Sequence, residues 1–472
     1  MHTVKQQWLG NIRADILSGI VVALALIPEA IAFSIMAGVD PMVGLYASFT
    51  IATVIAFVGG RPAMISAATG AMAIVVVDLV ADYGLQYLLA ATILTGIIQI
   101  FLGIFGIAKL MRFIPNAVMI GFVNSLAILV FMAQLPHFIG GNSMTYLFLF
   151  ITIGLVYFIP KVFKMVPAPL IAVVLLTAAA FVFQLDLKTV GDLGAVPTSL
   201  PVFLLPDIPL SLETLQIILP YSLALAVVGL LESLLTAQIL DDMTDSKSNK
   251  NMEARGQGIA NIVNGFFGGM AGCAMIGQSM INVKSGGRGR LSTLVSGIFL
   301  MFLIVVLGDI VVDIPMPVLA GIMVMVAITA FDWGSLKYSI TAPKGEVFVM
   351  LITIVIVLYT GNLAIGVVTG IIISALLFVA KISKVNITEN NGIYMIEGPL
   401  FFASTKAFVE QLEQAREPHI TIDLTSSHLW DESSVGALVK VISKLEEKGQ
   451  TVTVIGMNPA SQALYQKLTS FS

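Results

Sequence analysis

One carboxylate stands inside a long apolar stretch of this sequence. It is Glu232, in the run Gly229-Leu230-Leu231-Glu232-Ser233-Leu234-Leu235-Thr236. A charged side chain at the centre of a membrane helix costs about 2.5 to 3.5 kcal/mol even on insertion scales, so a functional role is the default hypothesis. Thr236 lies one helical turn later on the same face. The two side chains could supply oxygen ligands to Na⁺, or Glu232 alone could carry a proton. A structural carboxylate satisfied by a neighbouring helix is the alternative.

Two short apolar segments, 69–82 and 275–284, each follow a glycine-rich stretch. Both are shorter than the roughly 20 residues that a helix needs to cross a bilayer. We expect two half-helices whose N-termini meet near the middle of the membrane. Unpaired backbone N–H groups and a partial positive charge at a helix N-terminus favour a small anion. Close packing of small residues is the alternative interpretation.

Residues at the start of these two segments would touch an anion held there. Thr69 can add a hydroxyl donor, and Phe33 would provide an apolar wall. The neighbouring residues would let the anion approach the main chain closely: Ala67, Ala68, Gly70, Cys273, Ala274 and Met275. Glu29 follows Pro28, which frees a backbone carbonyl. Glu29 therefore either lines the pocket or the cytosolic pathway, or hydrogen-bonds to that disturbed backbone.

The composition is that of an integral membrane protein. Of 472 residues, 57% are hydrophobic and 11% are charged, and the mean hydropathy is +0.97. A soluble chain carries roughly 25% charged residues, so a soluble enzyme with a membrane anchor is excluded. Cys273 is the single cysteine, which excludes an intrachain disulfide. The sequence carries no catalytic or nucleotide-binding motif. We therefore expect neither an enzyme nor a nucleic-acid partner, and no cofactor beyond a coupling Na⁺ or H⁺.

The apolar runs predict fourteen helical segments in two sets of seven. The first set is 16–37, 42–60, 69–82, 85–107, 116–136, 144–162 and 168–184. The second set is 216–238, 256–271, 275–284, 291–308, 311–330, 346–360 and 362–380. With the N-terminus in the cytoplasm, the basic residues near span ends, Arg112 and Lys164 among them, fall on the cytoplasmic side, and only Lys188 falls outside. This pattern predicts a bacterial inner-membrane protein, with lipid around it and both termini in the cytoplasm.

The two sets are copies of one unit. The short segments occupy the third and tenth positions, and Ile114-Pro115-Asn116-Ala117-Val118 with Gly121 is echoed by Ile314-Pro315-Met316-Pro317-Val318 with Gly321. We place the repeats at about 11–184 and 211–380. Because each has an odd number of segments, the second must be inverted relative to the first. Paired short, glycine-interrupted segments in inverted repeats are typical of the substrate site of a secondary transporter.

The C-terminal part of the chain has a different character. Runs 392–402, 419–424 and 451–456 predict strands, and 403–416, 434–448 and 458–470 predict helices. Alternating strands and helices indicate a small α/β domain. We therefore divide the chain into a transmembrane domain, 1–385, and a cytoplasmic domain, 386–472.

These residues resemble the SulP family of anion transporters over nearly the whole chain. Pro28-Glu29-Ala30-Ile31-Ala32-Phe33 is similar to the family's first-helix motif, and Gly44-Leu45-Tyr46 to the start of its second helix. Gly256-Gln257-Gly258 with Asn261, followed by Gly268-Gly269 and Asn282-Val283, resembles the ninth and tenth helices of bicarbonate-transporting members. The resemblance implies a core and a gate, as in uracil-permease-like proteins, that work by alternating access.

The resemblance also bears on the coupling ion and the substrate. Bicarbonate-transporting members carry Asp where this chain has Glu232, and a Thr that matches Thr236, which implies a coupling-cation site. They carry Thr where this chain has Ile276, so a possible ligand is lost. Many sulfate- and chloride-handling members place Arg where this chain has Gln278. Without that fixed charge, the resemblance favours bicarbonate over sulfate, with Gln278 in the pocket.

The tail resembles a STAS domain, in which Asp423-Leu424 ends a strand and Asp431-Glu432-Ser433-Ser434 opens a helix. Ser433 matches the phosphoacceptor position of related regulators, although Ser434 replaces their glycine. The resemblance implies a dimerisation or regulatory module, and we expect a homodimer.

Together these observations predict a secondary active transporter of a small inorganic anion. Bicarbonate with Na⁺ coupling is the first hypothesis. The alternatives are a sulfate or dicarboxylate/H⁺ symporter, and an uncoupled anion channel or exchanger on the same fold.

Overall fold

The computed structural model describes residues 4–106, 109, 113–162, 167–196 and 199–470. Arg112 and Lys164, used in the orientation argument, and the last residue of the predicted segment 85–107 lie outside these ranges. The chain divides into two compact units, Met1–Ile371 and Ile372–Ser472.

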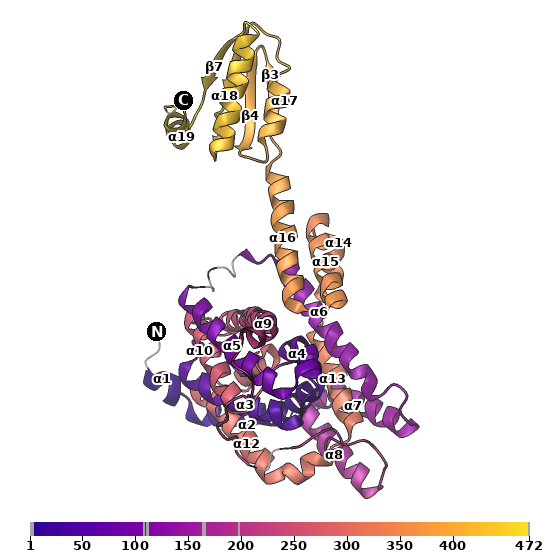
Figure 1. The fold of residues 1–472 in the computed structure, drawn as a ribbon. Coiled ribbons are helices and arrows are strands. Elements are labelled where there is room, and N and C mark those ends of the chain that lie inside the picture. The colour runs from indigo at the N-terminus through magenta and orange to yellow at the C-terminus, as the bar shows by residue number, and fades with distance from the viewer. Residues whose placement is uncertain (1–3, 107–108, 110–112, 163–166, 197–198, 471–472) are drawn as a thin grey trace. The chain divides into compact units, whose positions relative to one another are not determined.

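The helical segments follow the predicted order (Figure 1). The first set is α2 (Ile12–Met36), α3 (Pro41–Val58), α4 (Gly70–Tyr83), α5 (Leu85–Ile104), α6 (Asn116–Gln134), α7 (Ser143–Val162) and α8 (Ala168–Val182). The second set is α9 (Leu212–Thr244), α10 (Lys250–Phe266), α11 (Ile276–Lys284), α12 (Arg290–Val312), α13 (Met316–Ala330), α15 (Lys344–Thr360) and α16 (Leu363–Ile382). Two short helices, α1 (Val4–Leu9) and α14 (Gly334–Thr341), and one 3₁₀ turn (Leu135–His137) are additional.

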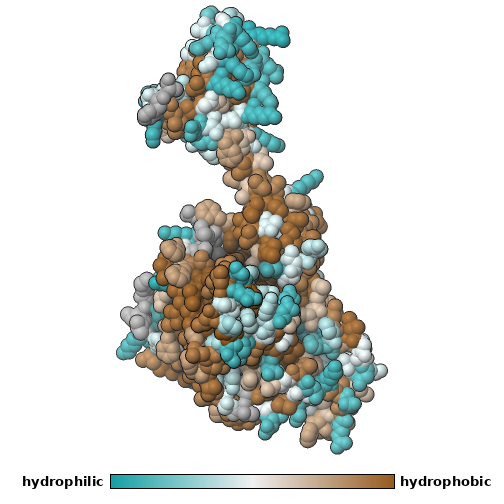
Figure 2. All heavy atoms as spheres, viewed as in Figure 1, coloured by the Kyte–Doolittle hydropathy of each residue, from teal (hydrophilic) through white to brown (hydrophobic). Residues whose placement is uncertain are grey.

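The helical unit has the dimensions and surface of a membrane domain. Among the described residues, nine helices are long and apolar enough to cross a membrane. Hydrophobic residues cover most of the visible face of this unit, whereas the C-terminal unit shows many hydrophilic ones (Figure 2). The fold class predicted from the sequence is confirmed.

The packing of the helices repeats itself between the two halves. Helix α2 packs on α12 as α9 packs on α5, and α6 packs on α15 as α13 packs on α7. The matching glycines of the two repeats, Gly121 and Gly321, lie at equivalent helix contacts. A Cβ on Gly121 of α6 would lie 2.9 Å from Cβ of Thr353 in α15, and one on Gly321 of α13 would lie 2.8 Å from Cβ of Thr152 in α7. Small residues at such crossings let membrane helices approach closely.

The helices form two groups. The first contains α2, α3, α5, α9, α10 and α12, which pack on one another and on the short helices α4 and α11. The second contains α6, α7, α8, α13 and α15, and Figure 1 shows α6, α7, α8 and α13 together. Contacts between the groups run mainly from α2 and α4 to α6, α8 and α13. This division corresponds to the expected core and gate.

Several predicted boundaries were wrong at the ends of α9 and α10. Helix α9 continues to Thr244 rather than ending at 238, and α10 begins at Lys250 rather than 256, because polar side chains there pair with one another. Helix α10 ends at Phe266 rather than 271, because Gly268 adopts a φ of 80°, which a helix does not accept.

The C-terminal unit contains a five-stranded sheet with three helices. Strands β3 (Asn386–Asn390), β4 (Ile393–Leu400), β5 (His419–Asp423) and β7 (Thr451–Ile455) follow one another across the sheet, and β6 (Ser427–Leu429) pairs with β4. The unit also contains the end of α16 and the helices α17 (Thr405–Leu412), α18 (Glu432–Glu447) and α19 (Pro459–Thr469). Phe408, Ile422 and Leu438 are in its buried core. The sequence did not predict β3, which is mostly polar and exposed, or β6, which has three residues.

Candidate functional site

A small antiparallel ribbon joins the two repeats at the predicted site. Strand β1 (Ser66–Ala68) pairs with β2 (Gly272–Ala274), with Ala67 opposite Cys273. Helix α4 leaves the end of β1 and α11 leaves the end of β2, so the two helices start at opposite ends of the ribbon and run apart. The ribbon is about 10 Å long at ~3.3 Å per residue. Both helices are short, as predicted, with 14 and 9 residues.

The two helix N-termini are not equivalent. At α4, the Thr69 hydroxyl accepts a hydrogen bond from the Met72 N–H at 3.4 Å, and a Cβ on Gly70 would lie 2.9 Å from the ring of Phe33. At α11, Met275 provides no side-chain cap. Gly277, the second residue of α11, is exposed, and a Cβ placed on it would meet nothing within 4 Å. The start of α11 is therefore the more exposed of the two helix starts.

Glu232 lies against the ribbon, in a chain of polar contacts. Its side chain is buried, and its Oε2 accepts a hydrogen bond from Cys273 Sγ at 3.0 Å. Cys273 Sγ also lies 3.2 Å from the Thr69 hydroxyl oxygen. Either atom of this second pair can be the donor. The hydroxyl predicted to meet an anion thus lies against Cys273 in this conformation.

Thr236 lies one turn from Glu232, but its hydroxyl donates to the Glu232 backbone carbonyl at 2.7 Å. The hydroxyl oxygen keeps its lone pairs for a cation, as does the Glu232 carboxylate. No basic side chain pairs with that carboxylate in the part of the chain that the structure describes. Glu232 and Thr236 thus place two oxygen-bearing side chains one helical turn apart, and Glu232 is a buried carboxylate.

Polar residues that the sequence did not single out as site residues hold the ribbon in place. Asn261 of α10 accepts from the Gly272 N–H at 2.9 Å and donates to the Gly272 carbonyl at 3.0 Å and to Gln99 Oε1 at 2.9 Å. Ser233 accepts from the Ala274 N–H at 3.0 Å, and Ser279 accepts from the Ile65 N–H at 2.9 Å. Asn261 thus fastens β2 to α10 and α5. Gln99 could have been noticed as a polar residue within the apolar run 85–107.

Glu29 and Gln278 are brought together across 249 positions of sequence. Gln278 Nε2 donates to Glu29 Oε1 at 2.7 Å, and both side chains are buried. In the residues that the structure describes, the Glu29 carboxylate bonds to this amide and makes no hydrogen bond to the backbone near Pro28. Gln278 belongs to the first turn of α11, so this pair lies beside the exposed helix start.

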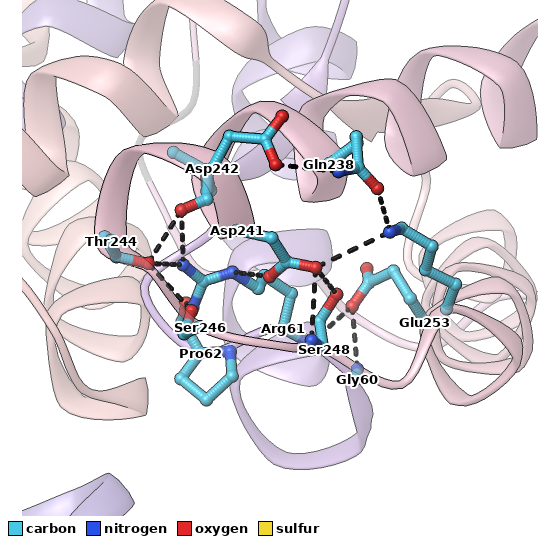
Figure 3. A network of polar contacts seen from close by, with 12 residues as sticks. Gly60, Arg61, Pro62, Gln238, Asp241, Asp242, Thr244, Ser246, Ser248 and Glu253 are labelled. Atoms are coloured by element: carbon cyan, nitrogen blue, oxygen red, sulfur yellow. Dashed lines mark hydrogen bonds and ion pairs between the residues drawn. The ribbon is translucent and has the colours of Figure 1, made fainter.

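A second polar network anchors the segment that leads into β1 (Figure 3). The Arg61 guanidinium lies 3.0 Å from Asp241 Oδ1 and donates to Thr244 Oγ1 at 2.7 Å, both at the end of α9. Glu253 of α10 accepts from the N–H groups of Gly60 and Arg61 at 2.7 and 2.9 Å. Glu253 also accepts from Gln257, which reaches Ser66 of β1 at 2.6 Å. This network fixes one arm of the ribbon to α9 and α10.

Ser433 lies at the second position of α18, on a different unit. It is exposed, and it lines a groove of about 470 Å³ between α17 and α18. Its neighbour Ser434 is buried in a reciprocal hydrogen-bond cap with Asp431. The serine predicted as a regulatory position is therefore the accessible one of the two.

Comparison with known proteins identifies the family. A family model described as "Sulfate permease family" matches residues 12–152 and 142–353, and a STAS domain model matches residues 383–471. "Putative sulfate transporter YbaR" of Bacillus subtilis is 58% identical over 475 residues, covering 99% of each chain. "Bicarbonate transporter BicA" of Synechocystis is 28% identical over 523 residues, covering 98% of this chain and 91% of that one.

Two solved transporter structures are similar to this one. The transmembrane domain of a cyanobacterial bicarbonate transporter BicA superposes with a TM-score of 0.65 at 26% identity, covering 78% of this chain and 98% of that one. The murine Solute Carrier 26 family member A9 anion transporter, in its inward-facing state, shares the fold with a TM-score of 0.83 at 15% identity, covering 99% of this chain and 88% of that one. The chain therefore belongs to the sulfate permease family of anion transporters and carries a C-terminal STAS domain.

Proposed function

We propose that the protein is a secondary active transporter of a small monovalent anion, with bicarbonate as the first candidate, driven by Na⁺ bound at Glu232 and Thr236. One observation carries this proposal: the exposed, uncapped start of α11 lies on the same ribbon as a buried carboxylate without a basic partner among the described residues. The first feature attracts an anion, and the second requires a cation.

The charge balance favours a monovalent anion. A helix N-terminus supplies roughly +0.5 of an elementary charge. Glu232 accepts a hydrogen bond from Cys273 of the ribbon, and Glu29 accepts one from Gln278 of α11. Among the described residues, no arginine or lysine pairs with either carboxylate. A doubly charged anion would find less compensation there. Bicarbonate also has an O–H group that can donate to a carboxylate, whereas sulfate near neutral pH only accepts hydrogen bonds.

The same balance supports coupling. An ionised Glu232 repels an anion at the ribbon, and a cation bound at Glu232 removes that repulsion. Each ion then raises the affinity for the other by the same factor, because coupling between two sites is reciprocal. Symport follows if the empty carrier and the doubly loaded carrier move between the two sides more readily than a carrier with one ion.

Sulfate is the second candidate, because the 58% identical YbaR relative bears a sulfate transporter name. In that case a proton on Glu232 would compensate part of the sulfate charge. An uncoupled channel is less well supported, because a pore gains nothing from a buried carboxylate that repels its substrate.

Purified protein in liposomes tests these candidates. Uptake of labelled bicarbonate, sulfate and fumarate is measured under an imposed Na⁺ gradient, an imposed H⁺ gradient, or neither. The proposal predicts that a Na⁺ gradient drives bicarbonate uptake and that Glu232→Gln abolishes this dependence. Uptake indifferent to both gradients, and unchanged in Glu232→Gln, would reject symport.

The proposal includes the setting of the transporter. The basic residues at the span ends support insertion in the bacterial inner membrane with both termini in the cytoplasm. The STAS domain supports assembly as a homodimer. Cysteine labelling from either side of sealed vesicles tests the first statement, and light scattering of the purified protein tests the second.

A further inference from the structure

The chain passes from one helix group to the other after α8 and again after α12. The passage after α8 is long, because α8 ends at Val182 and α9 begins at Leu212. The passage after α12 is short: α12 ends at Val312 and α13 begins at Met316, so residues 313–315 alone connect them. A stretch of this length spans at most about 14 Å, so the two groups cannot move far apart at this point.

The two passages are paired by backbone hydrogen bonds. Three N–H groups donate to carbonyl oxygens across the pair: Val190 to Ile314 at 2.9 Å, Gly191 to Val312 at 3.0 Å and Met316 to Lys188 at 2.8 Å. Thr189 lies opposite Pro315 in an antiparallel bridge. Because the first and third bonds flank this bridge, Thr189 and Pro315 form a non-hydrogen-bonded pair. Proline has no N–H group, so it loses no bond at this position.

The paired residues, 187–191 and 312–316, form a joint with a buried interior. Val190 is 0% exposed, and Leu187, Ile314 and Met316 are buried as well. Separating the two strands would expose these apolar side chains and leave three backbone N–H groups without acceptors, and both changes cost free energy. We therefore expect the joint to stay closed while the helices around it move.

Both helix groups are attached to the joint. Met316 is the first residue of α13, which belongs to the second group. On the other side, the linker continues onto the first group. There the Ala195 carbonyl accepts a hydrogen bond from the Met42 N–H of α3 at 3.1 Å. Further along, the Leu204 N–H donates to the Phe266 carbonyl of α10 at 2.8 Å.

Helix α12 contains a bend just before it reaches the joint. Leu307 has a φ of −111° and a ψ of 16°, which are not helical values, although the chain is helical on both sides. Residues near the end of an element often absorb the φ/ψ change of a hinge. The last turn of α12, 308–312, can therefore stay with the joint while the longer part, 290–306, turns with the first group.

We propose that the joint formed by residues 187–191 and 312–316 is the pivot about which the two helix groups turn, with the bend at Leu307 as its flexible element. The groups then stay together at this end. They separate most at the opposite end, where α12 begins at Arg290 and α13 leads into α14. This inference rests on the proposed function in one respect, that transport requires the two groups to move.

The first experiment measures this motion without transport, with pairs of spin labels on the purified full-length protein. Cys273 is 0% exposed, so labels attach to the introduced cysteines. The near pair is Asp186→Cys with Asp309→Cys, and the far pair is Ser285→Cys with Ser339→Cys; all four positions are exposed. Distances are recorded in sodium bicarbonate, sodium sulfate and choline chloride. We expect one narrow, constant distance for the near pair, and for the far pair a distance that changes with the salt or has two populations.

Two results of this experiment would overturn the pivot. A near-pair distance that changes as much as the far-pair distance would mean that the groups slide past each other along their whole length. A far-pair distance that is single and identical in every salt would mean that the groups do not turn at all.

The second experiment lengthens the short passage. Insertion of Gly-Ser-Gly-Ser between Val312 and Asp313 frees α12 from the joint. We expect uptake of labelled bicarbonate and sulfate into liposomes to slow at least about fivefold, because the groups lose their common pivot. The affinity for either anion, measured by calorimetry, should stay within about twofold. The matched control is the same insertion between Leu200 and Pro201, in an exposed part of the linker, which should leave uptake within about twofold.

A disulfide across the joint tests whether its strands part during transport. The Cα atoms of a non-hydrogen-bonded pair are about 4.5 Å apart, which a disulfide can span. The variant Thr189→Cys with Pro315→Cys should therefore form the bridge under mild oxidation. Its uptake should then stay within about twofold of the uptake by the reduced form. Uptake that is lost on oxidation and recovered on reduction would overturn the pivot, because the strands would have to separate in each cycle.

The outcomes separate this inference from the proposed function. If liposomes take up neither anion, while the far pair moves and the near pair does not, the proposed function fails and the pivot stands. If the insertion between Val312 and Asp313 leaves uptake equal to that of the parent protein, the pivot fails and the proposed function stands.

Discussion

At the scale of single residues, Gly277 distinguishes the open end of the ribbon from the closed one. A side chain on Gly277 would enter open space at the start of α11, whereas one on Gly70 would press on Phe33. Two helix starts that look alike in the sequence therefore differ in what they can bind. The difference arises from residues far away in the chain, since Phe33 belongs to α2.

We predict that Gly277→Leu weakens anion binding without weakening the fold. Leucine is up to about 1 kcal/mol more favourable than glycine inside a helix, and no described atom lies within 4 Å of a Cβ at this position. It would, however, occupy the space beside the backbone N–H groups of α11. We expect at least a tenfold loss of anion affinity, about 1.4 kcal/mol, with an unchanged or higher melting temperature.

Gly154→Leu is the matched control for this prediction. Gly154 lies in α7, and a Cβ placed on it also meets nothing within 4 Å. This variant should bind the anion as the parent protein does. Equal losses of affinity in both variants, or none in Gly277→Leu, would contradict the assignment of the α11 start as the anion site.

The sequence predicted some of the site residues but not the residues that contact them. Glu232 was found because a carboxylate in an apolar run is conspicuous. The partners of the site residues were not found, because Glu29 and Gln278 are 249 positions apart and Gln99 meets Asn261 across 162. The closing of the α4 end by Thr69 and Phe33 was missed for the same reason: it depends on packing and not on spacing.

At the scale of elements, the Arg61–Asp241 pair ties the arm before β1 to the end of α9. Both side chains are 7% exposed. Removing one partner of such a buried ion pair leaves the other charge uncompensated and costs about 3 to 5 kcal/mol. We predict that Asp241→Ala lowers the free energy of unfolding of the purified protein by about 3 to 5 kcal/mol, which will appear as a lower melting temperature.

The neighbouring residue Asp242 provides the control. It is exposed and, among the residues whose structure is described, its side chain accepts a hydrogen bond from Gln238 alone. Asp242→Ala should therefore change stability by no more than about 0.5 kcal/mol. Equal melting temperatures for Asp241→Ala and the parent protein would show that the network in Figure 3 does not support the ribbon.

In the STAS domain, one ion pair gives a pH dependence with a defined sign. Lys444 donates to Glu413 Oε1 at 2.6 Å, and this bond lowers the pKa of Glu413 from its ordinary value of 4.5. A lowered pKa in the folded state means that the stabilisation is complete above pH 4.5 and is lost as the pH falls through the folded-state value.

We therefore predict that Lys444→Gln speeds amide hydrogen exchange in α17 and α18 at pH 7. The difference from the parent protein should shrink as the pH falls below 4.5, where the glutamate gains its proton in both. A difference that stays constant at acidic pH would mean that Lys444 acts through packing of its hydrocarbon chain instead of its charge.

The sequence predicted the order of the helices better than it predicted which segments pair with each other. The seven-plus-seven pattern followed from apolar runs, whose lengths are fixed by the bilayer. The β1–β2 ribbon was not predicted, because Ser66–Ala68 and Gly272–Ala274 are too short and too rich in small residues to show a strand pattern. Such strands form because the partner from the other repeat satisfies their backbone groups.

At the scale of the whole molecule, the candidate site is built entirely from residues of the first unit, Met1–Ile371. The family model for the STAS domain begins at residue 383, and α16 ends at Ile382. We predict that a chain ending at residue 385 still takes up the anion and still responds to the Na⁺ gradient. Uptake per molecule in liposomes checks this.

A shortened chain that inserts in the membrane and binds the anion, yet transports none, would contradict this prediction. Such a result would assign the STAS domain a part in the transport cycle itself. The parent chain reconstituted at the same density is the reference, and binding measured on both proteins separates a transport defect from a folding defect.

In the proposed transporter, an anion at the start of α11 and a cation at Glu232 stabilise each other. Calorimetry of bicarbonate binding, with Na⁺ or with choline in its place, measures this directly. We predict that Na⁺ tightens bicarbonate binding by about 5- to 150-fold, the usual range of coupling between two sites, and that Glu232→Gln removes the effect. Bicarbonate binding that is the same with Na⁺ and choline, or a sodium effect that survives in Glu232→Gln, would contradict it.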